Sequence, residues 1–194
     1  MIMRQLRIRE LPAARDKLGD AFVVALIVLA LFWSYQLRQR VDERDYLIRT
    51  IAFEASDETE VGKVAVAYVV LNRKKSGRWG DNIKAVVTHP DQFEPWMTRR
   101  KDIETLSLND PRYQSAAIIA DAVLNGQTPD PTAGATHFLN PTIVRERRGG
   151  SLPSWALGEG RAIGSHIFYS PDASPRQGSL ISSAMAEPPV SPTP

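Results

Sequence analysis

The longest apolar stretch of the chain is an uncharged run over residues 21–37. Its centre, from Ala21 to Trp33, is apolar on every face. A helix at the surface of a soluble domain would show a polar stripe. The run has the length of a short bilayer-crossing helix, which needs about 17–25 residues. We therefore predict a transmembrane segment over 21–37, between an N-terminal segment over 1–20 and a linker over 38–45.

The flanks of this run fit a membrane anchor. Trp33 and Tyr35 stand where an aromatic belt would lie, and Arg38 and Arg40 follow as interfacial residues. No small-residue cleavage site separates the run from these arginines, so we expect the anchor to stay attached. A cleaved signal peptide and a buried core helix are the alternatives. Basic residues stand on both sides, so the positive-inside rule does not fix the orientation.

The periodicity of the next residues predicts two helices. Leu47, Ile48 and Ile51 have helical spacing and place one helix over Val41–Phe53. A second helix is predicted to begin at Asp57, which with Glu60 fits a capping box. It continues to about Arg73.

The pattern changes from helical to extended toward the C-terminal side. A short helix is predicted over Asn82–Thr88 with Asp81 as its cap. A longer helix is predicted to begin after the cap Asp110, with Pro111 in its first turn, and to end before Gly126. Residues 135–139 and 165–169 are β-prone and alternate in polarity, which predicts two strands. Helices followed by a small sheet indicate an α+β fold for the single folded unit, residues 46–172.

Composition narrows the possible functions. The 194 residues include no cysteine, which excludes disulfide scaffolds, thiol catalysis and cysteine-ligated metals. The net charge of +2 is too small to indicate nucleic-acid binding. Residues 173–194 are rich in Pro and Ser with few large apolar side chains, which predicts a disordered tail.

Histidine and serine chemistry finds little support in the sequence. The three histidines, His89, His137 and His166, form no metal-binding motif. His137 and His166 lie on the two predicted strands and could face each other, either as hydrogen-bonded residues or as zinc ligands. Ser165 and His166 are adjacent on a strand, so their side chains would point to opposite faces. We predict no metal and no cofactor.

A carboxylate gives the best candidate for catalysis. Capping explains Asp57 and Glu60, and the field of a helix N-terminus explains Glu58. Glu54 lacks such an explanation, because it stands at the C-terminal end of the first helix beside apolar neighbours. The helix dipole and desolvation both raise the pKa of a carboxyl there, as a general acid requires. A solvated acid at a helix end is the alternative.

Two loop patches could line a sugar-binding cleft. One is Gln92–Trp96, with an amide and aromatic rings, and the other combines residues 138–141 with Trp155 and Tyr169. Aromatic faces suit sugar rings, and amides suit N-acetyl groups. Each patch could equally be loop packing.

Several separated segments resemble one family in the same order. They are residues 47–58, residues 62–73, Gln92-Phe93, residues 135–141, Trp155 and residues 163–169. Together they resemble the SleB-type cell wall hydrolase, or spore cortex-lytic enzyme, family over about residues 46–172. Members of this family cleave peptidoglycan. The resemblance implies a small lysozyme-like or lytic-transglycosylase-like helical lobe joined to a short antiparallel β sub-domain.

The resemblance also implies roles for individual residues. The first Glu of the family's opening motif, the catalytic acid, falls on Glu54, and the second falls on Glu58. Phe53 and Asp57 replace the glycines of that motif. The expected substrate-binding residues are Glu58, Asn72, Gln92, Phe93, His137, Asn140, Trp155, His166 and Tyr169.

These features predict a membrane-anchored enzyme that cleaves the peptidoglycan glycan strand. With one candidate acid, a lytic transglycosylase is favoured over a muramidase-like hydrolase, which usually needs two carboxylates. Residues 1–20 would be cytoplasmic and residues 46–172 would face the cell wall from the cytoplasmic membrane. The alternatives are a zinc-dependent N-acetylmuramoyl-L-alanine amidase using His137 and His166, an inactive murein-binding protein, and a phage lysis enzyme whose anchor is released.

Overall fold

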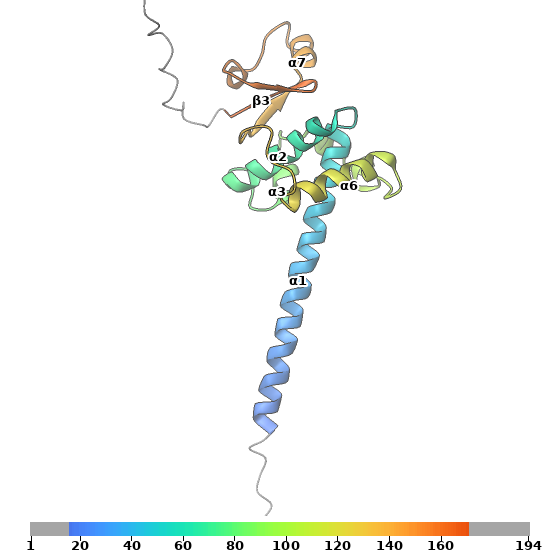
Figure 1. Ribbon diagram of the computed structural model, residues 1–194, viewed down its shortest axis with the longest axis vertical. Helices are drawn as coiled ribbons and strands as arrows, with labels where there is room; N and C mark the ends of the chain where they lie inside the picture. The colour runs from blue at the N-terminus through green and yellow to red at the C-terminus, as the bar shows by residue number, and fades with distance from the viewer. Residues whose placement is uncertain (1–15, 171–194) are drawn as a thin grey trace, which may run out of the picture. The chain divides into compact units, whose positions relative to one another are not determined.

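The computed structural model describes residues 16–170 of the chain (Figure 1). Residues 1–15 lie outside this range, and so does the predicted tail over 173–194. The chain divides into two units, one up to Glu43 and one from Arg44 onward, which are described separately.

The first unit consists of the N-terminal part of helix α1, which as a whole spans Asp16–Glu54. Its apolar side chains are exposed, and Phe22 and Trp33 reach 66% and 68%. The hydroxyl of Ser34 donates to the carbonyl of Ala30 at 2.7 Å, which satisfies this polar group within the helix. By length and composition the helix could cross a membrane, although a signal sequence would meet the same criterion. The predicted linker over 38–45 is helical.

The second unit begins with a layer of helices packed around α2 (Figure 1). After the end of α1 come α2 (Glu60–Ser76), α3 (Ile83–Val87), α4 (Glu94–Thr98), α5 (Arg100–Glu104) and α6 (Pro111–Leu124). Helix α2 is apolar on two faces. Val64, Ala67 and Val70 join the core of the helical layer, while Ala65, Val66 and Val69 pack toward the β sheet.

The last turns of α1 are part of the core of the second unit. Leu47, Ile48 and Ile51 are completely buried, which confirms the helical periodicity of the sequence. Buried Thr50 accepts a hydrogen bond from the indole N–H of Trp96 at 2.9 Å. Its hydroxyl in turn donates to the carbonyl of Tyr46 at 2.7 Å. These contacts hold the C-terminal part of α1, which ends at Glu54.

The helix caps agree with the sequence in one case and differ in two. Asp110 caps α6 by accepting from the backbone N–H of Arg112 at 2.9 Å, as predicted. The predicted start of α2 at Asp57 is wrong, because the N-cap is Thr59, which accepts from the backbone N–H of Gly62. The N-cap of α3 is Asn82, whereas the sequence pattern predicted the cap at Asp81.

The loop between α1 and α2 explains why α2 begins later than the sequence predicted. The N–H of Glu58 donates to the carbonyl of Ala55 at 3.2 Å, so a turn occupies the positions predicted to open α2. The carboxylate of Glu58 is held by residues more than 100 positions away in the sequence, as described below. Local cap propensity therefore does not decide where α2 begins.

A three-stranded antiparallel sheet completes the second unit. Its strands are β1 (His137–Leu139), β2 (Arg161–Ile163) and β3 (His166–Tyr169), in the order β1-β3-β2. The α+β class and both predicted strands are confirmed, whereas β2 was not predicted. The segment between β1 and β2 contains α7 (Pro141–Arg147) and the short 3-10 helix η1 (Ser154–Ala156).

Candidate functional site

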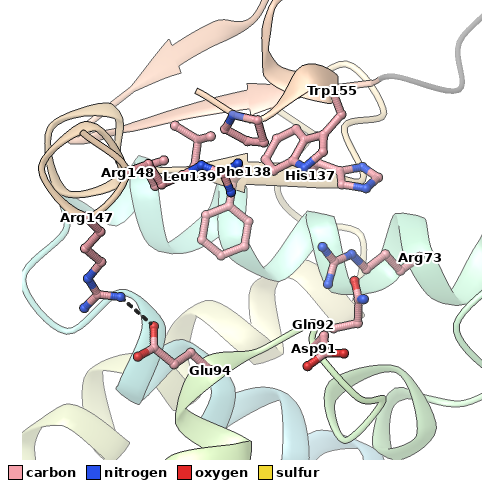
Figure 2. Close-up of a pocket in the computed structure, with 12 residues that line it drawn as sticks. Arg73, Asp91, Gln92, Glu94, His137, Phe138, Leu139, Arg147, Arg148 and Trp155 are labelled. Carbon is pink, nitrogen blue, oxygen red and sulfur yellow. Dashed lines mark hydrogen bonds and ion pairs between the residues drawn. The ribbon is translucent and has the colours of Figure 1, made fainter. Parts of the chain in front are cut away.

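A cleft of about 570 Å³ lies where the helical layer meets the β1–α7 segment (Figure 2). It is lined by Arg73, Asp91, Gln92, Glu94, His137, Phe138, Leu139, Val144, Arg147, Arg148, Pro153 and Trp155. The structure thus brings together three residues that were predicted as binding residues from separate segments: Gln92, His137 and Trp155.

Glu54 is a half-buried acid within electrostatic reach of this cleft. Its Oε1 atom is completely buried and has no hydrogen-bond partner, although the residue as a whole is only partly buried. Burial, and secondly repulsion from Glu94, raise the pKa of Glu54 to about 8, although Arg73 opposes this. Both Glu94 and Arg73 line the cleft. At neutral pH Glu54 therefore carries a proton that it can donate.

Arg73 is a site residue that was not predicted from the sequence. It is 4% exposed and stands in the last turn of α2. Its Nε donates to the carbonyl of Thr136 at 2.6 Å. Its guanidinium lies 4.8 Å from the ring centre of Phe93 and 5.2 Å from that of Trp79. Burial lowers the pKa of Arg73 to about 10, with Glu54 acting in the opposite direction. In the sequence it looks like an ordinary basic residue at a helix end.

Glu58, by contrast, is an ionised residue that joins two parts of the fold. Its carboxylate accepts hydrogen bonds from the backbone N–H of Ser165 at 3.3 Å and from the Ser165 hydroxyl. Oε1 also lies 2.9 Å from Nδ1 of His166. Burial alone would raise the pKa of Glu58, but the Ser165 hydrogen bonds and His166 outweigh it and hold the pKa below its usual value.

Four of the expected binding residues are not among those that line the cleft, and their side chains contact other parts of the protein instead. Asn72 donates from Nδ2 to Asp130 and to the carbonyl of Ala135, both at 3.0 Å. The side chain of Asn140 caps α7. Phe93 is 1% exposed in the core. Tyr169 is 5% exposed and packs edge-on against Trp155, with ring centres 5.6 Å apart.

The two histidines on the strands do not face each other, so that prediction is wrong. His137 pairs with Tyr169 across β1 and β3, whereas His166 pairs with Ile163 of β2. The His137 ring lies 5.0 Å from that of Trp155 and 5.6 Å from that of Trp79. His166 is instead bound to Glu58. Across residues 16–170, the structure gathers no group of three or more metal-ligating side chains.

Comparison with known proteins places this geometry in a family. The model of the cell wall hydrolase family matches residues 57–169. Two curated spore cortex-lytic enzymes are similar over 115 residues, which is 59% of this chain. The protein from Halalkalibacterium halodurans is 36% identical, and the chain covers 31% of it. The protein from Oceanobacillus iheyensis is 30% identical, and the chain covers 37% of it. The chain thus spans about a third of the length of these relatives.

Two solved structures share the fold. The catalytic domain of the germination-specific lytic transglycosylase SleB from Bacillus anthracis is 25% identical with a TM-score of 0.52, over 66% of this chain and 93% of that one. The catalytic domain of the Bacillus cereus SleB protein is 22% identical with a TM-score of 0.50, over 66% and 89%, and this likeness concerns the fold. Since the family model matches more than half of the 194 residues, the chain belongs to the cell wall hydrolase family.

Proposed function

We propose that this chain cleaves the glycan strand of peptidoglycan as a lytic transglycosylase, with Glu54 as its general acid. The observation that carries this proposal is the buried, unpartnered Oε1 of Glu54, whose carboxyl has a pKa of about 8 within reach of the cleft. The similar catalytic domain from Bacillus anthracis bears the name of a lytic transglycosylase, which supports the same reaction.

The reaction needs only one carboxyl group. Glu54 donates its proton to the glycosidic oxygen as the bond to the muramoyl anomeric carbon breaks. The 6-hydroxyl of the same muramoyl residue then attacks that carbon and returns a proton to the Glu54 carboxylate. The product is a 1,6-anhydro end, and the enzyme regains its starting protonation state.

Two other acids of this region, Glu58 and Glu94, are already engaged in ion pairs. A hydrolase would usually need a second carboxylate about 5–9.5 Å from the acid. Glu58 is bound to Ser165 and His166. Glu94 lies 3.1 Å from the guanidinium of Arg147. These contacts favour the single-acid route over hydrolysis.

The cleft suggests how the sugar is held. We propose that Trp155 and His137 offer ring faces to a sugar and that the amide of Gln92 binds an N-acetyl group. Glu58, Asn72, Phe93, Asn140, His166 and Tyr169 then support the cleft walls. Trp155 is supported from behind by Tyr169, at 5.6 Å between ring centres.

The test uses the full-length chain and isolated peptidoglycan. Glu54→Gln should abolish the release of anhydromuramoyl fragments, measured by mass spectrometry. The matched control is Glu104→Gln, an exposed acid of α5 with an ion pair to Arg100 at 4.0 Å, which should retain activity. Unchanged activity of Glu54→Gln, or new L-alanine amino ends in place of anhydro ends, would refute the proposal. The second result would favour an amidase.

We further propose that residues 21–37 anchor the enzyme in the cytoplasmic membrane with residues 46–172 on the cell-wall side. The absence of cysteine allows a clean topology test. Exposed Ser151 replaced by Cys should react with a membrane-impermeant thiol reagent on intact spheroplasts. Ala14→Cys should react only after lysis. The reverse labelling pattern would contradict this orientation, and recovery of the chain in the soluble fraction would contradict the anchor.

A further inference from the structure

Within residues 16–170, two buried side-chain polar atoms have no hydrogen-bond partner: Oε1 of Glu54 and Nη1 of Arg73. Buried polar groups are nearly always paired, so each unpaired one needs an explanation. The proposed role as general acid accounts for Glu54. It does not account for Arg73.

The charge of Arg73 is not compensated by its protein neighbours. Its Nε bonds to a backbone carbonyl, that of Thr136, which carries no net charge. The rings of Phe93 and Trp79 beside its guanidinium are neutral as well. In the described part of the chain, no carboxylate lies within ion-pair distance of Arg73. Glu54 is its electrostatic neighbour but is protonated at neutral pH. A buried cation without a partner is strongly unfavourable unless a ligand neutralises it.

The guanidinium of Arg73 points into the cleft (Figure 2). Two further arginines line the cleft from α7 and its C-terminal cap, namely Arg147 and Arg148, against two acids, Asp91 and Glu94. Glu94 already forms an ion pair with Arg147. Arg73 and Arg148 therefore outnumber the remaining acid, Asp91, and the cleft favours a negatively charged group.

We propose that Arg73 is a substrate-binding residue that takes a carboxylate of the peptidoglycan through its unpaired Nη1. A guanidinium is suited to a carboxylate because its planar N–H groups match the two oxygens. This proposal rests on the proposed function and adds to it a preference for anionic strands. Peptidoglycan offers this chemistry from two sources: the stem peptide, and the lactyl group of a muramoyl residue that has lost its peptide.

The test measures binding in a background that does not cleave, the full-length Glu54→Gln chain. The ligands are soluble muropeptide fragments with free carboxylates, the same fragments with amidated carboxyls, and peptide-free glycan oligomers that keep the lactyl carboxylate. Fragments with free carboxylates should bind about tenfold more tightly than the amidated fragments, as expected for a charge-assisted hydrogen bond. Tight binding of peptide-free oligomers would assign the lactyl group, and tight binding of peptide-bearing fragments alone would assign the stem peptide.

Arg73 itself is tested by substitution in the same background. Arg73→Gln should remove the preference for carboxylates, and Arg73→Lys should retain part of it. Arg161→Gln is the matched control, since this exposed arginine also donates to a backbone carbonyl, that of Pro131 at 2.8 Å, outside the cleft. The preference should persist in this control.

Two results would overturn the proposal. One is equal affinity for free and amidated fragments, which needs no variant at Arg73 and so decides the matter even if Arg73→Gln fails to fold. The other is an unchanged preference in a folded Arg73→Gln chain. Cleavage by the unmodified chain without any carboxylate preference would refute this inference alone. Carboxylate binding without cleavage would refute the proposed function alone.

Discussion

The carboxylate of Glu58 lies 2.9 Å from Nδ1 of His166, which joins the α1–α2 loop to the β2–β3 hairpin. Ser165, in the turn of that hairpin, donates to the same carboxylate from its backbone N–H and its hydroxyl. Gly164 begins the turn with a φ of 59° and faces Glu58 so closely that a Cβ would overlap the carboxylate. The contact between the helical layer and the sheet therefore depends on a glycine at this position.

Gly164→Ala should destabilise the fold more than an ordinary substitution at a positive-φ glycine. Gly149→Ala is the matched control, because Gly149 has a φ of 61° and no atom lies within 4 Å of the position that its new methyl group would take. The control should lose about 1–2 kcal/mol of unfolding free energy from backbone strain. Gly164→Ala should lose about 1–3 kcal/mol more as its contact with Glu58 is displaced. Equal losses in urea unfolding would contradict this role of Gly164.

The buried hydroxyl of Thr50 should contribute measurably to stability. Thr50→Val keeps the shape but leaves the indole N–H of Trp96 without its acceptor, which lies at 2.9 Å. The expected loss is about 1–3 kcal/mol of unfolding free energy. Thr50→Ser keeps the acceptor and should retain more of this stability than Thr50→Val. Urea unfolding followed by tryptophan fluorescence would check the order, and a Thr50→Val chain as stable as Thr50→Ser would contradict it.

Glu54 should make the stability of the protein fall as the pH rises. Its pKa is about 8 in the folded protein against an ordinary 4.5. Below pH 4.5 the Glu54 carboxyl is protonated in both the folded and the unfolded protein, so it does not reduce the free energy of unfolding. Between these values the unfolded chain releases the proton while the folded protein keeps it, which favours unfolding. The accumulated penalty is on the order of a few kcal/mol at about pH 8.

The matching measurement compares the unmodified chain with Glu54→Gln across this range. Glu54→Gln should be the more stable of the two at about pH 8, and the gain should shrink toward pH 4.5. Unfolding free energies from urea titrations at several pH values would give the slope. Parallel pH profiles for the two proteins would show that Glu54 ionises at its ordinary pKa.

The same pKa sets an upper pH limit for catalysis. A general acid must be protonated, so kcat/KM on peptidoglycan should fall as the pH rises through about 8. The loss should approach tenfold per pH unit above that value. Rates of anhydro product formation from about pH 6 to about pH 10 would measure this fall in kcat/KM. A rate that rises through about pH 8 would assign the titration to a base instead of Glu54.

Trp155 should affect binding of the glycan more than the chemical step. It lines the cleft and packs against His137 at 5.0 Å between ring centres. Trp155→Ala should raise KM several-fold, as expected when an aromatic contact worth about 0.5–1.5 kcal/mol is lost. Trp155→Phe keeps a ring and should show a smaller increase. A drop in kcat at unchanged KM would contradict this role.

The sequence predicted those elements whose signals are local. The spacing of Leu47, Ile48 and Ile51 and the cap at Asp110 lie within single helices, and the structure confirms both. The start of α2 could not be predicted in this way, because Ser165 and His166 bind Glu58 from a distant part of the chain. Helices α4, α5 and α7 have five to seven residues each, too short for a hydrophobic period to appear.

The sequence by itself determined where the apolar run lies and that Glu54 ends a helix among apolar residues. Only the tertiary structure decided that Oε1 of Glu54 is buried. It also decided that Arg73 is an electrostatic neighbour of Glu54 and that Nη1 of Arg73 is buried without a hydrogen-bond partner. It also decided that Gln92, His137 and Trp155 line one cleft. The physical reason is that desolvation and electrostatic coupling depend on the side chains that fold around a group. Here those side chains come from segments that are far apart in the chain.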